Sequence, residues 1–364
     1  MSRLAGEGVW RPASWANAPW RRGWMRRMSA LALLWCAGGV LTYAAAQGAF
    51  GGGAGRSVGP PQRSVDEWLV RLQQGSSVPS FVGTYVVSAS NGAMASARIW
   101  HLCEGDLQLE RVDALSGPPR STFRRNDEVS LLLPDAHVLR SEQRAPGGRF
   151  PNLLRPGADQ AAAEHYTAQE TGQDRVAGMT TDVVVLKPVD QWRFGYRIWS
   201  ERRTGLVLKT QTLDGAGKVL EQSAFSEVQL DPPEPAVKTQ LAMPSTEGWR
   251  KVRIERVRID AAREGWRLEQ PVPGFEPQGC FRQSMGASNS VVQWVFSDGL
   301  ATVSIFIEPF DAKRHVHAGV SSLGATHAMS RRWPGAQGPW WVTLIGEVPR
   351  QTLTALLDNL RHDK

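Results

Sequence analysis

The chain has 364 residues, enough for two ordinary domains and a leader, and a net charge of +7. Residues 1–46 hold six arginines against one glutamate, which leaves 36 basic and 34 acidic side chains in the rest of the chain. This near balance lacks the basic footprint of a nucleic-acid-binding protein and excludes that class of partner.

The first 46 residues have the pattern of a secretory signal peptide. Arg26-Arg27 precede a 14-residue apolar run, Ala30 to Tyr43, which is short for a bilayer span. Ala44-Ala45-Ala46 then supply the small residues of a cleavage site. We therefore predict export to the periplasm by a Sec-type signal cleaved after Ala46, with translation starting at Met25 or Met28. An uncleaved N-terminal anchor is the alternative.

A glycine-rich spacer and one helix are expected next. Residues 47–63 have the composition of a flexible linker. Ser64 is suited to cap a helix from Val65 to about Gln74. Trp68, Leu69 and Leu72 form an apolar stripe that should pack across a sheet.

Nine strands are expected before residue 231. Asn91-Gly92 and the segment Asp214 to Gly217 tolerate positive φ and predict hairpins. Pro134–Gly157 is expected to be a long loop, followed by helical turns at Gln160–Tyr166. Short connections between strands favour an antiparallel meander. The predicted strands are Phe81–Ser88, Met94–Cys103, Leu107–Val112, Arg120–Arg125, Val129–Leu133, Thr181–Lys187, Arg193–Trp199, Leu206–Leu213 and Lys218–Leu230.

A boundary follows at Asp231-Pro232-Pro233-Glu234-Pro235, because proline removes backbone donors. Residues 231–264 are expected to be a linker. Within it, Lys251 to Arg263 alternates basic and apolar residues, and a solvated connector is favoured over an edge strand.

Residues 265–362 predict a small α+β domain. Asp298-Gly299 predicts a hairpin, and Leu353, Leu356, Leu357 and Leu360 give the spacing of an amphipathic closing helix after Pro349. The predicted strands are Cys280–Gln283, Val291–Ser297, Ala301–Glu308, Ala325–Ser330 and Trp340–Gly346.

No catalytic constellation, nucleophile elbow, phosphate loop or zinc spacing is found, which favours a binding protein without a cofactor. His315 and His317 would share one side of a strand, but no cysteine or carboxylate cluster accompanies them, so no metal site is predicted. Cys103 and Cys280 fall in different predicted domains. They are expected either to pair in a disulfide or to be separate buried thiols.

A broad antiparallel sheet with little helix has an apolar concave face, which its own core fills or a lipid chain occupies. The sequence leaves both alternatives open. The residues expected to line this face are Phe81, Tyr85, Val183, Val185, Phe194, Tyr196 and Trp199.

Six blocks follow one another in a recognisable order: Arg175 to Gly178, Phe194 to Trp199, Thr204 to Lys209, Asp214 to Phe225, Phe296 to Leu300 and Thr343 to Pro349. In this order they resemble the RseB/MucB family of periplasmic regulators of sigma-E. The resemblance runs from near Trp68 almost to Leu360.

The resemblance implies a large domain, 64–230, similar to the lipoprotein carriers LolA and LolB, with an unclosed antiparallel half-barrel under covering helices. It also implies that the protein binds the periplasmic region of a membrane-spanning anti-sigma factor, RseA or MucA, and shields it from the protease DegS. Lipopolysaccharide or lipoprotein acyl chains are expected to displace the protein. Arg140, Arg144, Arg149 and Arg155 are candidates to meet lipid phosphates, with a solvated loop as the alternative.

We therefore expect a mainly β, two-domain negative regulator of sigma-E. The alternative function is a periplasmic lipid or lipoprotein carrier that acts without an anti-sigma partner. A homo-oligomer is left open.

Overall fold

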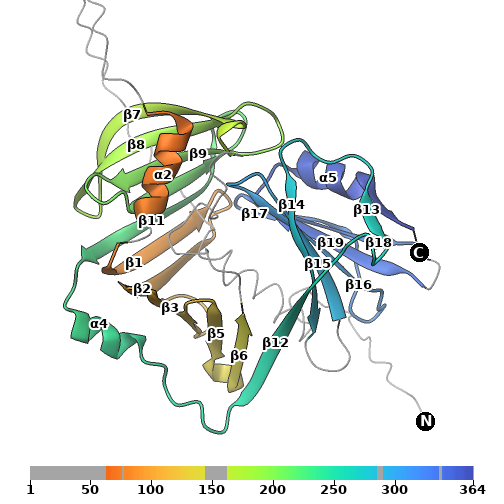
Figure 1. The fold of residues 1–364 in the computed structure, drawn as a ribbon, viewed down its shortest axis with the longest axis horizontal. Coiled ribbons are helices and arrows are strands. Elements are labelled where there is room, and N and C mark those ends of the chain that lie inside the picture. Colours follow the sequence, from red (N-terminus) through yellow and green to blue (C-terminus); the bar gives the residue numbers. More distant parts are fainter. Residues whose placement is uncertain (1–62, 76–77, 144–161, 285–289, 336–337, 364) are drawn as a thin grey trace, which may run out of the picture.

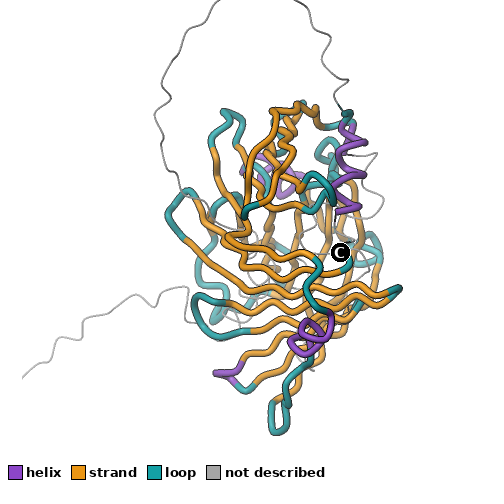
Figure 2. Tube along the Cα trace, turned by 90° about the vertical axis from the view of Figure 1, so that its left-hand side faces the viewer, coloured by secondary structure: helices purple, strands orange, loops and turns teal. Residues whose placement is uncertain are grey.

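The computed structural model describes residues 63–75, 78–143, 162–284, 290–335 and 338–363. The predicted leader 1–46 and nearly all of the spacer lie outside them. In the described part, no helix is long and apolar enough to cross a membrane. Strands make up most of this part, and its helices are few and short (Figure 2).

Eleven strands form the sheet of the large domain. Their spatial order is β7-β8-β9-β10-β11-β1-β2-β3-β4-β5-β6, and every neighbouring pair is antiparallel. The strands are β1 Ser80–Ala89, β2 Met94–Glu104, β3 Leu107–Ala114, β4 Ser121–Arg125, β5 Glu128–Leu133, β6 Val138–Gln143, β7 Tyr166–Val176, β8 Met179–Pro188, β9 Gly195–Glu201, β10 Val207–Leu213 and β11 Val219–Leu230.

The small domain continues as β14-β15-β16-β19-β18-β17, again antiparallel. A separate pair, β13 with β20, lies beside it. Helix α5 (Arg350–Asn359) buries Leu353, Leu356 and Leu357 in the core of this domain. The strands are β13 Trp266–Leu268, β14 Glu276–Ser284, β15 Ser290–Ser297, β16 Thr302–Pro309, β17 Gly319–Leu323, β18 Thr326–Trp333, β19 Trp340–Gly346 and β20 Leu360–His362.

Strand β12 (Arg250–Ile259) joins the two sheets into one run of strands. Its first half, Arg250 to Ile254, pairs in parallel with β6, and its second half, Glu255 to Ile259, pairs antiparallel with β14. Figure 1 shows β12 rising from the large domain into the small one. The preference for a solvated connector over 251–263 was therefore wrong, because the β-branched residues between the charges favour an extended strand.

Two helices pack on the large sheet. Helix α2 (Val65–Gly75) begins with a reciprocal cap, in which Glu67 N donates to Ser64 Oγ (3.2 Å) and Ser64 N donates to Glu67 Oε2 (2.7 Å). Its apolar stripe packs on side chains of β8 and β9, as predicted. Helix α4 (Glu234–Leu241) covers β2 and β3 through Val237 and Leu241.

The prediction of a mainly β, unclosed antiparallel sheet with covering helices and a small α+β domain is confirmed. Two parts of the large domain were predicted wrongly. The segment expected to be one loop contains the 3-10 turn η2 (Pro134–Ala136) and strand β6, and strand β7 was missed. Both strands are largely polar, so neither gives the apolar alternation by which strands are recognised.

Candidate functional site at the domain interface

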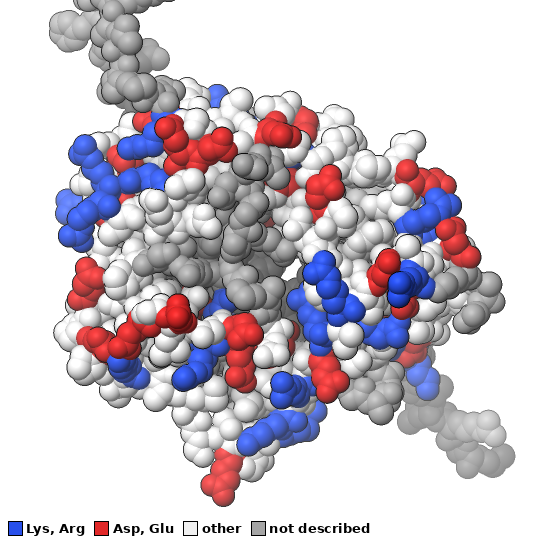
Figure 3. Space-filling model, in the orientation of Figure 1, with Lys and Arg blue, Asp and Glu red and all other residues white. Residues whose placement is uncertain are grey.

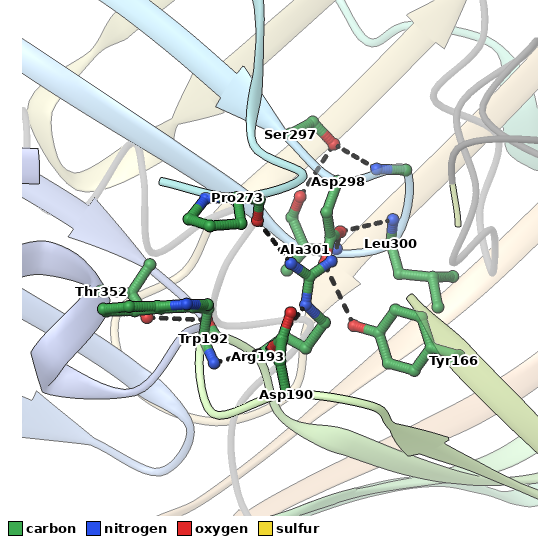
Figure 4. A network of polar contacts seen from close by, with 11 residues as sticks. Tyr166, Asp190, Trp192, Arg193, Pro273, Ser297, Asp298, Leu300, Ala301 and Thr352 are labelled. Carbon is green, nitrogen blue, oxygen red and sulfur yellow. Dashed lines mark hydrogen bonds and ion pairs between the residues drawn. The ribbon is translucent and has the colours of Figure 1, made fainter. Parts of the chain in front are cut away.

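Arg193 lies in the connection between β8 and β9, and its side chain is completely buried. All three guanidinium nitrogens donate hydrogen bonds, which Figure 4 shows converging on this residue. Nε donates to Asp190 Oδ1 (3.0 Å), Nη1 to Asp298 Oδ2 (3.1 Å) and Nη2 to the carbonyl of Pro273 (2.6 Å). Two of these acceptors belong to the small domain, so one large-domain cation is enclosed by both domains.

Asp298 lies in the turn between β15 and β16 and is also fully buried. Its Oδ1 accepts the backbone N–H groups of Leu300 (2.9 Å) and Ala301 (2.6 Å), while Oδ2 accepts the Tyr166 hydroxyl (3.2 Å) as well as Arg193. Burial raises the pKa of Asp298, and Arg193 with the two backbone donors offsets part of that rise. We call Tyr166, Asp190, Arg193, Pro273 and Asp298 the Arg193 cluster.

The neighbours of Arg193 in sequence also face the small domain. Trp192 packs against the small-domain core, and its carbonyl accepts the Thr352 hydroxyl at 2.7 Å. The ring of Phe194 lies 5.9 Å from that of His327 in β18. The segment 192–194 is therefore an interdomain contact along its whole length.

A second contact lies at the β17–β18 turn. Ala325 N donates to Glu221 Oε2 of β11 at 3.0 Å. A Cβ at Gly324, whose φ is +58°, would lie 2.5 Å from the same oxygen, so the positive φ and the close approach both favour glycine here. Burial, and then the charge of Glu221, raise the pKa of Glu347 well above its usual value. The two carboxyl groups therefore disfavour each other's ionisation at the interface.

The Arg193 cluster makes domain docking depend on a few groups. A buried ion pair contributes little net stability, but removal of one partner leaves an uncompensated charge and costs about 3–5 kcal/mol. Because every polar group of this pair has a partner, the docked arrangement is sharply defined. Any ligand that separates the domains must compensate for the free energy lost when this ion pair is broken.

The seven predicted lipid-lining residues are all buried, but they do not form one surface. Phe81, Tyr85, Val183 and Trp199 belong to one cluster of the large domain, with Phe225 among them. Tyr196 lies in another cluster, under α2. Phe194 lies at the domain interface, and Val185 is buried on β8. The alternation of β9 explains the split, because Tyr196 and Trp199 point to opposite faces.

Of the four predicted lipopolysaccharide contacts, Arg140 is described and Arg144, Arg149 and Arg155 lie outside the described residues. Arg140 lies on β6 opposite Val252 of β12. Burial, and then Arg250, lower the pKa of Arg140. Exposed basic side chains line β12 beside it, and Figure 3 shows them gathered over this strand. They are Arg250, Lys251, Arg253 and Arg258.

The two cysteines lie in different domains, and the two histidines differ in burial. Cys103 on β2 and Cys280 on β14 are free thiols in this structure. His315 is buried, with Nε2 3.1 Å from Glu308 Oε1, whereas His317 is exposed. Neither histidine is on a strand, so the expectation that both face one way on a strand was wrong.

Sequence reasoning missed the Arg193 cluster. Arg193 directly precedes the block Phe194 to Trp199, and Asp298 lies inside the block Phe296 to Leu300. The sequence patterns nevertheless indicated only a strand residue and a turn residue. The usable signal was an arginine between Trp192 and Phe194 at the start of a buried strand, since such a charge needs a partner. The partner is 105 residues away in sequence, and no local pattern indicates it.

Comparison with known proteins gives consistent matches over both domains. The family model described as the MucB/RseB N-terminal domain matches residues 64–246, and the MucB/RseB C-terminal domain matches 260–361. The sigma factor AlgU regulatory protein MucB of Pseudomonas aeruginosa is 30% identical over 81% of this chain and 90% of its own. The sigma-E factor regulatory protein RseB of Haemophilus influenzae is 22% identical over 76% of this chain and 84% of its own.

Two solved structures have a similar fold. The Pseudomonas aeruginosa MucA/MucB complex matches with a TM-score of 0.63 and 28% identity, covering 82% of this chain and 99% of that one. MucB in complex with MucA(peri) matches with a TM-score of 0.61 and 29% identity, covering 83% of this chain and all of that one.

Proposed function

Since the chain belongs to the MucB/RseB family, we propose that it is a periplasmic negative regulator of a sigma-E-type envelope-stress response. It binds the periplasmic region of a membrane-spanning anti-sigma factor of the RseA/MucA type and shields that region from regulated proteolysis. The observation that carries this proposal is the match, through both domains, to MucB crystallised with MucA(peri).

The Arg193 cluster supports a partner site that needs both domains. The ion pair holds the β8–β9 connection against the β15–β16 turn, and the Gly324–Glu221 approach holds the β17–β18 turn against β11. Two separate contacts fix one relative orientation. A segment of the anti-sigma factor that touches both domains binds most tightly when this orientation is already formed, because less conformational entropy is then lost on binding.

The position of the apolar cluster supports release by lipid. Val183 and Trp199 stand on β8 and β9, and the connection between these strands carries Arg193. An acyl chain that displaces the two side chains moves β8 and β9 and strains the ion pair. Lipid shifts the equilibrium only as far as it binds the separated arrangement better than the docked one.

The basic side chains of β12 favour an anionic lipid. Arg250, Lys251 and Arg253 are exposed beside Arg140, and their charges suit the phosphates of lipopolysaccharide. Because β12 pairs with both sheets, a headgroup bound there lies next to the strand that joins the domains. Lipoprotein acyl chains would use the apolar cluster without this contact.

A lipid or lipoprotein carrier that acts without an anti-sigma partner is the rival function. A carrier transfers its lipid to an acceptor and does not need docked domains. Deleting the small domain is a poor discriminator, because it would expose the buried Arg193. Point variants of the Arg193 cluster separate the two functions. They should weaken anti-sigma binding but leave lipid uptake by the large sheet unchanged.

The test is cleavage of the cognate anti-sigma periplasmic domain by its first regulatory protease. With purified protein present, cleavage should slow in proportion to the bound fraction, and lipopolysaccharide should restore it. Equal cleavage with and without the protein would refute the proposal. Protection that lipopolysaccharide leaves unchanged would refute release by lipid while retaining the shielding role.

A further inference from the structure

Three side chains of the large domain form a hydrogen-bonded chain that the proposed function does not use. His101 and Cys103 lie two residues apart on β2, so they point to one face, and Glu110 stands opposite His101 on β3. His101 Nε2 lies 3.2 Å from Cys103 Sγ, and Nδ1 lies 3.1 Å from Glu110 Oε1. His101 is fully buried, whereas Cys103 is partly exposed.

The surroundings hold the imidazole in place. The ring of Phe81 stacks on it at 4.8 Å with an interplanar angle of 15°. Gln108 Nε2 donates to Glu110 Oε1 at 3.2 Å, which orients the carboxylate. The ring can therefore keep one nitrogen on the sulfur and the other on the carboxylate.

This order of groups is that of an activated nucleophile, in which a base contacts the nucleophile and a third group orients the base. Burial lowers the pKa of His101, but the hydrogen bonds with Cys103 and Glu110 outweigh it and raise that pKa to about 9. The titratable groups in contact with the ring are Cys103 and Glu110, and Arg124 of β4 lies in register with Glu110. A protonated imidazole at hydrogen-bond distance stabilises a thiolate.

Cys280 provides a contrast within the same chain. It is 5% exposed in the small-domain core, and burial, followed by the charge of Glu264, raises the pKa of its thiol to about 11. An apolar site beside a carboxylate disfavours a thiolate. The two cysteines therefore differ in access and in charge environment.

We propose that Cys103 is a modification site that undergoes thiol–disulfide exchange with a low-molecular-weight disulfide such as oxidised glutathione. The Cys103 thiolate attacks one sulfur of the disulfide while His101 holds the proton. The S–S bond of the small molecule breaks, a mixed disulfide forms on Cys103, and the other half leaves as a thiolate that takes up the proton. Cys103 is oxidised, and the leaving half is reduced by the same two electrons.

The test measures mixed-disulfide formation by mass spectrometry after incubation of the purified protein with oxidised glutathione at about pH 6. The adduct should form on Cys103 about tenfold faster than on N-acetylcysteine, because the His101 imidazole lies 3.2 Å from Sγ and can hold the proton that the attacking sulfur gives up. Cys280 should stay unmodified. Cys103→Ser should remove the adduct.

His101 is tested as a positioning residue through the pH profile of the rate. His101→Gln and Glu110→Gln should both shift the profile toward that of N-acetylcysteine, with Cys280 still protected as the sign of an intact fold. Should either variant unfold, the profile of the unsubstituted protein decides alone. A rate at about pH 6 no faster than that of N-acetylcysteine, or an adduct first on Cys280, would overturn the proposal.

Discussion

Two of the connections between the domains are built in opposite ways. Strand β12 joins the sheets through backbone pairing with β6 and β14, and most of its charged side chains face water. The Arg193 cluster joins the same domains through side chains that are excluded from water. Backbone pairing tolerates many different side chains, whereas a buried ion pair tolerates almost no substitution of its two partners. The first connection therefore tethers the domains, and the second fixes their orientation.

The largest effect is expected at the ion pair. Arg193→Met keeps the length of the side chain but leaves Asp298 buried without its cation, and should lower the free energy of unfolding by about 3–5 kcal/mol. Denaturant unfolding measures this loss. Arg267→Met removes an exposed arginine that lies 2.6 Å from Asp363, and it should leave the unfolding free energy essentially unchanged.

The double variant Arg193→Met with Asp298→Asn sharpens the same contrast. The asparagine keeps an oxygen for the N–H groups of Leu300 and Ala301 and carries no charge. Stability should therefore recover in part relative to Arg193→Met. A double variant that is less stable than either single variant would show that charge burial is not the controlling term.

The stability of the tether, strand β12, should depend on its backbone hydrogen bonds. Ile254 is 6% exposed and lies in the part of β12 that pairs with β6. Ile254→Pro removes a backbone donor from the strand and should cost about 3 kcal/mol. Ile254→Val is the matched control, with an expected cost of about 1 kcal/mol. Equal losses for the two variants would mean that β12 is held by side-chain packing alone.

Acidification should weaken the interface on the small-domain side. Burial lowers the pKa of His327 below 6.5, only partly offset by its hydrogen bond to the Val348 carbonyl, and Arg350 lowers it further. Because the folded pKa lies below the unfolded one, the stability that this residue contributes is present above pH 6.5 and is lost as the pH falls. The slope is at most about 1.4 kcal/mol per pH unit.

Unfolding free energies measured from neutral to acidic pH check this slope. His327→Gln should flatten the pH dependence relative to the unsubstituted protein, while exposed His317→Gln should not. A pH dependence unchanged by His327→Gln would assign the acid sensitivity to other groups.

The smallest effect on stability is expected from the charges of β12. Arg253→Gln changes an exposed side chain and should alter the unfolding free energy by no more than about 0.5 kcal/mol. The same change should weaken binding to lipopolysaccharide vesicles, since one cation beside Arg140 is lost. Binding to neutral phosphatidylcholine vesicles is the control and should not change. Unaltered lipopolysaccharide binding would remove β12 from the proposed contact.

The sequence predicted those parts of the fold that local patterns encode. Asn91-Gly92 and Asp298-Gly299 placed two hairpins, the Ser64 cap placed α2, and the leucine spacing after Pro349 placed α5. These features depend on residues close together in the chain. Strands β6 and β7 were missed because pairing with neighbours determines them and their residues are mostly polar.

The candidate site was less predictable for the same reason. Arg193, Pro273 and Asp298 converge only after both domains have folded, and His101 meets Glu110 only through the register of β2 with β3. The apolar residues expected to line the concave face are buried, but alternation along β9 divides them between two faces. Composition predicts burial, whereas pairing register decides which buried groups meet.

The central claim is that the orientation fixed by the Arg193 cluster is the one that binds the anti-sigma factor. It is tested most directly by isothermal titration of the cognate periplasmic domain into the unsubstituted protein, Arg193→Met and Arg267→Met, below the unfolding range of each. Arg193→Met should weaken binding at least about tenfold, which is about 1.4 kcal/mol, while Arg267→Met should bind like the unsubstituted protein. Equal affinity for all three would contradict this claim.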